Sequence, residues 1–237
     1  MSAGAIEGRL CVCHLGLVAY EEALELQRGL RRARLDDATP DTLLLLEHPP
    51  TITLGRRTQE DDLLDARELL KARGFQVHEV ERGGRVTYHG PGQIVGYPIV
   101  ALRPRSLSVP KYVSLLEETV IRYLAGVGLE ARRRRGYPGV WTAGGKIAAL
   151  GVHLRRWVSM HGFSLNLATD LTHYQSIVAC GIADADVTSV ARELGSAPTV
   201  AEAAQDIARI FTELLGYQEV EWLSPASLAE VMSGANR

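Results

Sequence analysis

Apolar residues in the first third of the chain follow the periods of strands and helices in turn. Residues 10–15 alternate as in a short strand, and residues 20–35 carry apolar side chains at helical spacing with Arg and Glu on the other face. The same criteria predict strands at 42–46 and 75–80 and, between them, a helix at 63–72 that a glycine ends. The chain therefore begins as an alternation of strands and helices.

The middle of the chain combines one long helix with a stretch of β pattern. Ser108 is a plausible N-cap with a proline in the first turn, and residues 112–124 then carry a continuous apolar stripe that glycines end. Residues 146–154 and 158–165 show strand patterns on either side of Arg155-Arg156-Trp157, which predicts a hairpin. Residues 82–98 are rich in Gly and Pro and are expected to form loops around a short strand.

The C-terminal part predicts one more helix and one more strand. Thr199 and Glu202 form a capping box for a helix that runs to Leu215, and residues 217–222 follow as a strand. Helices alternate with strands, but the apparent hairpins argue against a purely parallel sheet. We therefore expect an α+β fold, a mixed sheet covered by helices. Residues 1–237 are expected to form a single domain, with residues 1–8 and 233–237 as loose ends.

Composition narrows the possible compartments and partners. With 46% hydrophobic and 23% charged residues the chain is typical of a globular protein, and its longest apolar runs are too short to span a bilayer. It lacks a basic segment followed by an apolar one near its start, so we expect a cytoplasmic protein with no membrane partner. The formal net charge of -2 gives no overall field for nucleic acid. The three cysteines are expected to be free thiols in this reducing compartment.

The arginine run from Arg132 to Arg135 has two interpretations. It can be the exposed edge of a strand, where like charges prevent edge-to-edge pairing. It can also be a docking site for an acidic partner, which salt would weaken. The sequence leaves both interpretations open.

Several familiar motifs fail on inspection. Gly144-Gly145-Lys146 lacks the other residues of a phosphate loop, and the glycines from Gly90 onward miss the dinucleotide fingerprint. Cys11 and Cys13 would face one side of a strand, which suits two small buried hydrophobic residues better than a metal site. The seven histidines show no metal-ligand spacing, so no metal site is expected.

A set of glycine-rich and polar loops is not explained by packing. Arg82-Gly83-Gly84 and the segment from His89 to Gly92 flank a short strand, and a backbone with so few side chains can approach a ligand closely. Each segment alone can be a tight turn. Together with Lys146, His161 and Cys180 they indicate the walls of one pocket.

Four ordered segments make the chain similar to the lipoyl(octanoyl) transferases of lipoate biosynthesis. They are RGGRVTYHGPGQIVGYP (82–98), GGKIAALGVH (144–153), HGFSLNL (161–167) and ACGI (179–182). Weaker agreement is found at 20–23, 47–49 and 187–189, so the resemblance covers nearly the whole chain. Ala179 is a departure, because the family usually has proline at this position beside the cysteine.

The resemblance implies a fold, an activity and a set of site residues. The fold would resemble the catalytic domain of biotin protein ligases and lipoate ligases. Cys180 would be the acyl-thioester nucleophile and Lys146 its acid/base partner. The substrate-binding walls would consist of Arg82, Gly83, Gly84, Arg85, Val86, Thr87, Tyr88, His89, Ala149, Leu150, Gly151, Gly162, Phe163 and Ser164.

The implied activity transfers an octanoyl group from octanoyl-acyl carrier protein to a lysine of lipoyl domains. The acceptors would be the lipoyl domains of 2-oxoacid dehydrogenase complexes and the glycine cleavage H protein. One thioester is exchanged for another of similar energy and aminolysis then runs downhill, so no ATP and no cofactor is expected. A free thiol with a pKa of about 8.5 is mostly protonated at neutral pH, and a cationic neighbour such as Lys146 would favour the thiolate. Tyr88, Leu150 and Phe163 could line the acyl slot.

Three other functions remain as alternatives. An ATP-dependent lipoate or biotin ligase of similar fold would activate a free acid and need no cysteine. A non-catalytic relative would bind acyl or lipoyl carriers only, although loss of the Cys or Lys would be its mark and both are present. A cysteine hydrolase would pair the thiol with a histidine, for which His89 or His161 could serve.

Overall fold

The computed structural model describes residues 8–178 and 186–233, and the text below concerns these residues. The strands are β1 (Arg9–Leu17), β2 (Asp41–Glu47), β3 (Thr51–Leu54), β4 (Gln76–Glu79), β5 (Val86–His89), β6 (Gln93–Ile99), β7 (Arg132–Arg134), β8 (Tyr137–Thr142), β9 (Gly145–Arg155), β10 (Val158–Asn166) and β11 (Glu219–Trp222). The α-helices are α2 (Tyr20–Leu35), α3 (Arg67–Ala72), α4 (Val109–Gly126), α5 (Val190–Leu194), α6 (Val200–Leu215) and α7 (Pro225–Ser233). The 3-10 helices are η1 (Glu60–Asp62) and η2 (Leu171–Ser176).

The described strands form two sheets. The larger one has the order β11-β1-β2-β6-β10-β9-β8-β7, and the smaller one has the order β4-β3-β5. In the larger sheet β1 pairs in parallel with both of its neighbours, whereas every pair from β2 to β7 is antiparallel. The predicted α+β class with a mixed sheet is therefore confirmed.

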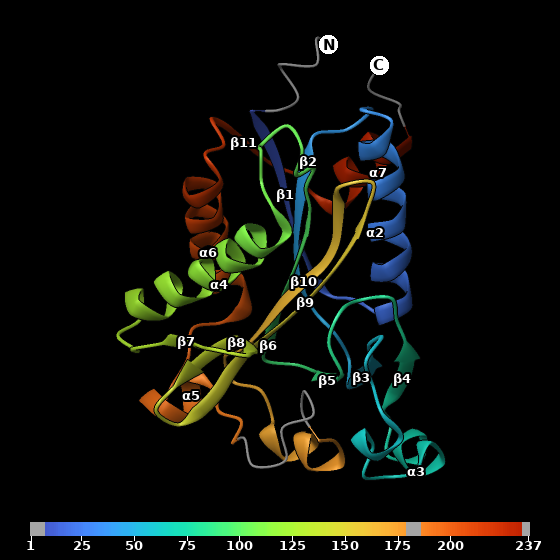
Figure 1. Ribbon diagram of the computed structural model, residues 1–237, viewed down its shortest axis with the longest axis vertical. Coiled ribbons are helices and arrows are strands. Elements are labelled where there is room, and N and C mark those ends of the chain that lie inside the picture. The colour runs from blue at the N-terminus through green and yellow to red at the C-terminus, as the bar shows by residue number, and fades with distance from the viewer. Residues whose placement is uncertain (1–7, 179–185, 234–237) are drawn as a thin grey trace.

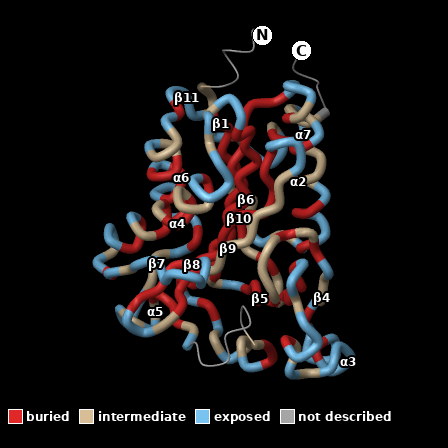
Figure 2. The backbone as a smooth tube through the Cα atoms, viewed as in Figure 1, coloured by how far each residue is buried: buried red, intermediate tan, exposed pale blue. Residues whose placement is uncertain are grey.

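Helices cover both faces of the larger sheet (Figure 1), α4 and α6 on one side and α2 and α7 on the other. Strand β2 shows how the sequence builds both cores, because successive side chains of a strand point to opposite faces. Leu43 and Leu45 pack in the cluster with α4 and α6, and Leu44 and Leu46 pack in the cluster with α2 and α7. The buried strands run through the centre of the molecule in Figure 2, between the exposed outer faces of the helices.

The helix-start signals in the sequence are confirmed in atomic detail. The Ser108 hydroxyl accepts a hydrogen bond from the Lys111 amide at the start of α4. Thr199 and Glu202 form the reciprocal capping box of α6, and Gly216 ends that helix in the left-handed conformation at a φ of 71°. Such caps satisfy backbone groups that a helix end leaves unpaired.

The predicted hairpin forms β9 and β10. Arg156 and Trp157 both adopt positive φ, as a two-residue hairpin turn requires. The register then pairs Ala149 with Ser164, Leu150 with Phe163 and Gly151 with Gly162. Two motifs that lie ten or more residues apart in the sequence thus become direct neighbours across one strand pair.

The predicted helix at 63–72 begins later than expected. Leu63 forms an antiparallel bridge with Ile177, and the Leu64 amide donates to the Ser176 carbonyl oxygen. This β-type pairing takes the first residues out of the helix, and α3 starts at Arg67.

Two strands lie where none was predicted. Strand β6 falls inside the segment rich in Gly and Pro, and β3 is a four-residue alternation, TITL, that the sequence analysis did not use. Gly96 of β6 lies under the Phe163 ring, and a Cβ at this position would overlap that ring. The glycine is therefore a packing requirement within a strand and not a sign of a loop.

The arginine run forms β7, an exposed edge strand of the larger sheet, as the first of its two interpretations predicts. The start of β1 and helix α7 lie toward one end of the described molecule, and the smaller sheet with α3 lies at the other (Figure 1). No helix in the described part combines the length and the apolar character that crossing a membrane would require.

Candidate active site

One cavity of about 470 Å³ lies against the hairpin of β9 and β10. The loop before β5, part of β5 itself and the turn between β7 and β8 complete its walls. The volume falls in the range of small-molecule sites.

Most of the residues expected at the site surround this cavity. Those that line it are Arg82, Gly83, Gly84, Arg85, Thr87, His89, Lys146, Ala149, Leu150, Gly151, Gly162, Phe163 and Ser164. They come from three distant parts of the sequence, which the β9–β10 hairpin and the loop before β5 bring together.

Val86 and Tyr88 do not line the cavity. Alternation along β5 directs Thr87 and His89 toward it and the other two side chains away from it. Val86 and Tyr88 pack instead in the core of the smaller sheet. The Tyr88 hydroxyl is 2.7 Å from His173 Nδ1. Tyr88 is thus placed outside the acyl slot that the sequence analysis suggested for it.

Glycines allow the loop before β5 to lie directly on β9. The Gly83 amide donates to the Val152 carbonyl oxygen at 2.9 Å. A Cβ on Gly151 would stand 2.7 Å from the Gly83 carbonyl oxygen, closer than van der Waals contact allows. The glycine at 151 is therefore required by the backbone of the opposing loop.

Arg82 organises this loop from inside. Its side chain is buried, and Nη2 donates to the Thr53 carbonyl oxygen at 2.7 Å. Nη1 donates to the Arg85 carbonyl oxygen at 2.8 Å. The guanidinium thus joins the loop to β3 of the smaller sheet and fixes one wall of the cavity.

Lys146 enters the cavity from the start of β9. Only 5% of the residue is exposed, and Nζ donates to the Pro138 carbonyl oxygen at 2.9 Å. The ammonium also lies 5.5 Å from the centroid of the Trp141 ring, within the range of a cation–π interaction. The backbone of Lys146 pairs with the segment from Asp186 to Thr188, through N–H···O distances of 2.8 and 3.0 Å.

Cys180, expected as the nucleophile, lies outside the described residues. The other two cysteines, Cys11 and Cys13, are buried free thiols, as expected from their spacing. Burial raises the pKa of each to about 11. Neither thiol therefore supplies thiolate at neutral pH.

The histidine in the cavity wall is held neutral. Burial lowers the pKa of His89 well below its ordinary value. The Gln93 amide nitrogen donates to the Tyr88 carbonyl oxygen, so Gln93 Oε1 is the atom that accepts from His89 Nδ1–H, at 2.8 Å. This arrangement leaves Nε2 of His89 as a hydrogen-bond acceptor and suits a positioning role.

A histidine and a carboxylate meet at the far end of the cavity from Lys146. His161, at a φ of 56°, places Nε2 3.8 Å from Glu81 Oε2. The nearby His161 imidazole lowers the pKa of Glu81 to about 2, although 3.8 Å is too long for a hydrogen bond between them. Burial lowers the pKa of His161, so at neutral pH an uncharged imidazole faces a carboxylate.

The sequence analysis missed several residues of the cavity wall, among them Tyr20, Tyr97, Val113, Tyr137 and Pro138. Tyr20 and Tyr97 are buried aromatic residues that no local pattern distinguishes from core. Pro138 does have a local signal in the sequence, because a Pro-Gly pair within a β pattern indicates an irregular strand. Among the described residues, no three His, Cys, Asp or Glu side chains gather as a metal site would require.

Comparison with known proteins assigns the family. Residues 19–212 match the lipoyl protein ligase A/B catalytic domain. The chain belongs to this family. The octanoyltransferase of Acidobacterium capsulatum is 46% identical over 235 residues, which cover 92% of this chain and 95% of that protein. The octanoyltransferase of Caldicellulosiruptor saccharolyticus is 42% identical over 226 residues, 94% of this chain and 96% of that protein.

Solved structures of the family and of biotin protein ligase share the fold. The bi-partite lipoate protein ligase of Thermoplasma acidophilum superposes with a TM-score of 0.70 at 18% identity, over 96% of this chain and 92% of that one. Biotin protein ligase of Aquifex aeolicus gives a TM-score of 0.52 at 11% identity, over 86% of this chain and 69% of that one. The fold implied by the sequence resemblance is confirmed.

Proposed function

We propose that this family member transfers an octanoyl group from octanoyl-acyl carrier protein to a lysine of a lipoyl domain, through a thioester on Cys180. The names of its relatives support octanoyl transfer as its part in lipoate biosynthesis. The acceptors would be lipoyl domains of 2-oxoacid dehydrogenase complexes and the glycine cleavage H protein. The free thiols of Cys11 and Cys13 suit the reducing cytoplasm as the place of the reaction.

The observation that carries this proposal is the position of Lys146. Its ammonium is buried in the wall of a cavity that the glycine loops and the β9–β10 hairpin enclose. Asp186, which bonds the Lys146 backbone, follows Cys180 by six residues in the sequence. Since the other two cysteines are buried thiols with raised pKa, Cys180 is the cysteine that suits nucleophilic catalysis.

The proposed reaction has two steps. In the first, the Cys180 thiolate attacks the carrier thioester, the acyl–Cys bond forms, and the carrier thiolate leaves with a proton from the Lys146 ammonium, which becomes a neutral amine. In the second, the acceptor amine attacks the new thioester, the bond to Cys180 breaks, and Lys146 removes the proton of the incoming amine. A cationic lysine favours the thiolate in the first step, and the two groups would titrate as a coupled pair.

The cavity suits an acyl chain bound in this way. Leu150 and Phe163, paired across β9 and β10, present apolar surface to it. Tyr20, Tyr97 and Val152 continue the wall away from Lys146. A chain held along the hairpin would place its carbonyl end toward Lys146 and bury its tail between these side chains.

A single-turnover experiment tests the proposal. The protein is mixed with octanoyl-acyl carrier protein without acceptor, and its mass is measured. We expect a gain of one octanoyl group that hydroxylamine removes and that maps to Cys180. Adding a lipoyl domain should discharge this intermediate onto the domain without ATP, and steady-state rates should follow a ping-pong scheme.

Cys180→Ala removes the proposed nucleophile and should abolish both steps. Cys13→Ala is the matched control and should leave both steps intact. Transfer at full rate without an acyl-enzyme would mean direct attack and would refute the thioester mechanism. A requirement for ATP and free octanoate would favour a ligase, to which the shared fold also points. Hydrolysis of the acyl-enzyme faster than transfer would favour a hydrolase.

A further inference from the structure

An irregularity in the ladder between β7 and β8 lies beside Lys146. Arg133 pairs with Val140, but the next residue, Arg134, pairs with Tyr137. Pro138 and Gly139 are therefore left out of the β7–β8 pairing. Bulges of this kind are frequent next to active sites, where they redirect backbone groups and side chains.

The backbone groups released by this bulge have other partners. The Pro138 carbonyl oxygen accepts the hydrogen bond from Lys146 Nζ, at 2.9 Å. The Gly139 amide donates to Glu117 Oε1 of α4, at 3.1 Å. Since Pro138 C=O and Gly139 N–H belong to the same peptide unit, the Glu117 carboxylate and the Lys146 ammonium bind its two ends.

Gly139 is the residue that lets Lys146 reach this peptide. Its φ is +129°, a backbone conformation that residues with a side chain rarely adopt. A Cβ there would stand 2.6 Å from Lys146 Cε and 3.1 Å from Nζ. The lysine side chain thus passes directly over the peptide whose carbonyl it contacts.

Glu117 is well anchored for holding this peptide. The residue is 9% exposed, and its Oε2 accepts from Arg133 Nε at 3.1 Å while Oε1 binds Gly139. Arg133 also donates to the Ser114 carbonyl oxygen at 2.8 Å, which ties it back to α4. Glu118, the next residue of the helix, contacts Arg133 and Arg122 but makes no contact with β8 among the described hydrogen bonds.

We propose that Glu117 is a positioning residue that sets the orientation of the Lys146 ammonium through the Pro138–Gly139 peptide. The inference rests on the proposed acid/base role of Lys146. Without the carboxylate the buried Gly139 amide loses its partner, and the peptide is free to rotate toward other acceptors. Its carbonyl oxygen then turns away from Nζ, and the lysine loses one of the contacts that orient it in the cavity wall.

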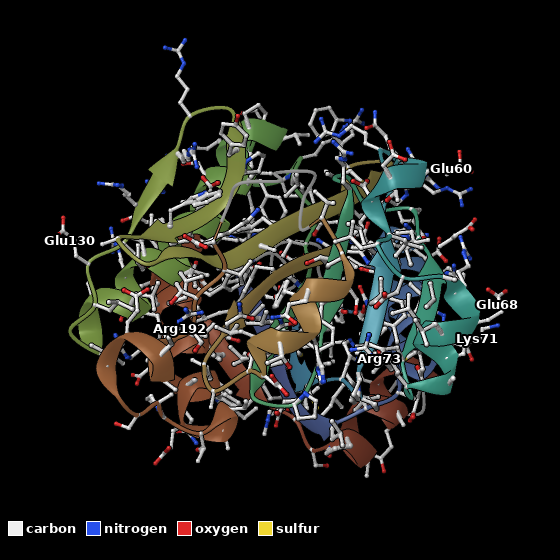
Figure 3. The ribbon with its side chains drawn as sticks, turned by 90° about the horizontal axis from the view of Figure 1, so that it is seen from below. Glu60, Glu68, Lys71, Arg73, Glu130 and Arg192 are labelled. Carbon is white, nitrogen blue, oxygen red and sulfur yellow. The ribbon has the colours of Figure 1, made fainter. Side chains whose placement is uncertain are left out.

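Chemical labelling tests this inference without using enzymatic activity. The chain has three lysines, and Lys71 and Lys111 are both exposed. Lys71 points away from the molecule at its edge (Figure 3), and Lys111 lies on α4 itself. Trace acetylation with acetic anhydride, read for each lysine by peptide mass spectrometry, gives the reactivity of Lys146 relative to two internal standards.

We expect Glu117→Ala to change the relative labelling of Lys146 while that of Lys71 and Lys111 stays constant. Glu117→Gln keeps one oxygen that can accept from Gly139. It loses the bond from Arg133 Nε, but Arg133 is still held by Ser114 and Glu118, so Lys146 should label nearly as in the original protein. Glu117→Asp keeps the charge beside Arg133 but draws the carboxylate back by one methylene, so it should resemble Glu117→Ala. The aspartate variant also serves if the alanine variant fails to fold. Glu118→Ala is the matched control on the same helix and should leave Lys146 unchanged.

Kinetics provide the second measurement. Misplacing a catalytic group by about 1 Å can cost on the order of 10²-fold, so Glu117→Ala and Glu117→Asp should lower kcat by about tenfold or more. KM for the acyl donor should change by less than about threefold, since the cavity wall itself is intact. Glu117→Gln should restore kcat.

Several outcomes would overturn the inference. Unchanged Lys146 labelling in both Glu117→Ala and Glu117→Asp would do so, as would equal changes in the Glu118→Ala control. A loss of kcat without any change in Lys146 labelling would assign Glu117 another role. Failure of the proposed function is separable, because full activity of Lys146→Met would remove the lysine from the mechanism while the labelling still reports on Glu117.

Discussion

Strands β2 and β9 belong to the same sheet but are built for different tasks. From Asp41 to Leu46 every residue of β2 is buried, and its leucines fill the cores on both faces of the sheet. Strand β9 buries Ile147 and Ala148 in one core, whereas residues 149–154 are only half-buried. Residues 149–152 of this strand line the cavity.

The two strands differ in how much apolar surface they bury and in whether they present side chains to the cavity. A strand covered on both faces contributes apolar burial, the dominant favourable contribution to folding. A strand that lines a cavity gives up part of that burial, but it can present Lys146 and Gly151 to a ligand. The central strands β2 and β6, buried along almost their whole length, are then the scaffold that holds the cavity-lining strand in register.

The largest expected effect concerns the cavity-lining strand. Lys146→Met should fold normally but lose about 10²–10⁴-fold in transfer rate, the usual contribution of a general acid/base. The substitution removes the cation beside the proposed thiolate and the acceptor of the amine proton. Steady-state transfer to a lipoyl domain and thermal unfolding measure the two properties separately.

Lys146→Arg should not rescue transfer, because arginine keeps the charge but cannot give up a proton at working pH. It should preserve acylation of Cys180 better than aminolysis. Lys111→Met, on the outer face of α4, is the control for loss of a lysine and should be neutral. Near-normal transfer by the methionine variant would reduce Lys146 to a structural residue.

The next effect concerns the buried strand. Leu44 of β2 is fully buried in the core that α2 and α7 cover. Leu44→Ala should lower the free energy of unfolding by about 2–5 kcal/mol, the cost of an internal cavity. Urea unfolding measures this loss. The transfer activity per folded molecule should stay within about twofold, because Leu44 itself does not line the cavity.

Leu150→Ala sharpens the comparison, since this leucine is half-buried and faces the cavity. It should lose less stability than Leu44→Ala but should bind the acyl donor less tightly. If Leu44→Ala and Leu150→Ala lost equal stability and equal activity, β2 and β9 would not differ in their contributions to folding and to donor binding.

Much of the fold could be predicted from local signals. Residues 20–35, the Ser108 cap, the Thr199–Glu202 box and the hairpin at 155–157 each contain their own period or cap, and the structure confirms each one. The prediction failed where pairing with a distant segment decides the structure. The bridge from Leu63 to Ile177 shortens a helix, and nothing near residue 63 in the sequence indicates it.

The candidate site was predictable as a set of segments but not as a geometry. Strand alternation explains why Thr87 lines the cavity and Val86 does not, yet the sequence alone did not fix which face was open. The role of Glu117 could not be predicted, because it depends on a bulge in β8 and on a contact between segments 22 residues apart. Of the two interpretations of the arginine run, the exposed edge strand is confirmed for Arg132–Arg134, and a role in docking stays a prediction.

The smallest expected effect concerns this arginine run, at the edge of the larger sheet. Its four residues are not equivalent. Arg133 is held by Glu117 and Glu118, and Arg134 stacks over Tyr137 and Trp141 at 4.6 and 5.0 Å. Arg132 and Arg135 are exposed and form no ion pair with the described residues, so they are the two charges available to an acidic carrier protein.

Neutralising this pair tests docking without disturbing the bulge beside Lys146. At low salt, Arg132→Ala with Arg135→Ala should raise KM for octanoyl-acyl carrier protein by about two- to fivefold and leave kcat unchanged, because surface charges act on encounter more than on the bound state. Near 0.5 M salt the difference should vanish, since screening then confines charge effects to about 4 Å. Arg209→Ala, on the outer face of α6, removes a surface arginine far from β7 and should have no effect. An unchanged KM at low salt would leave the run with its structural role alone, as a charged edge that prevents pairing between sheets.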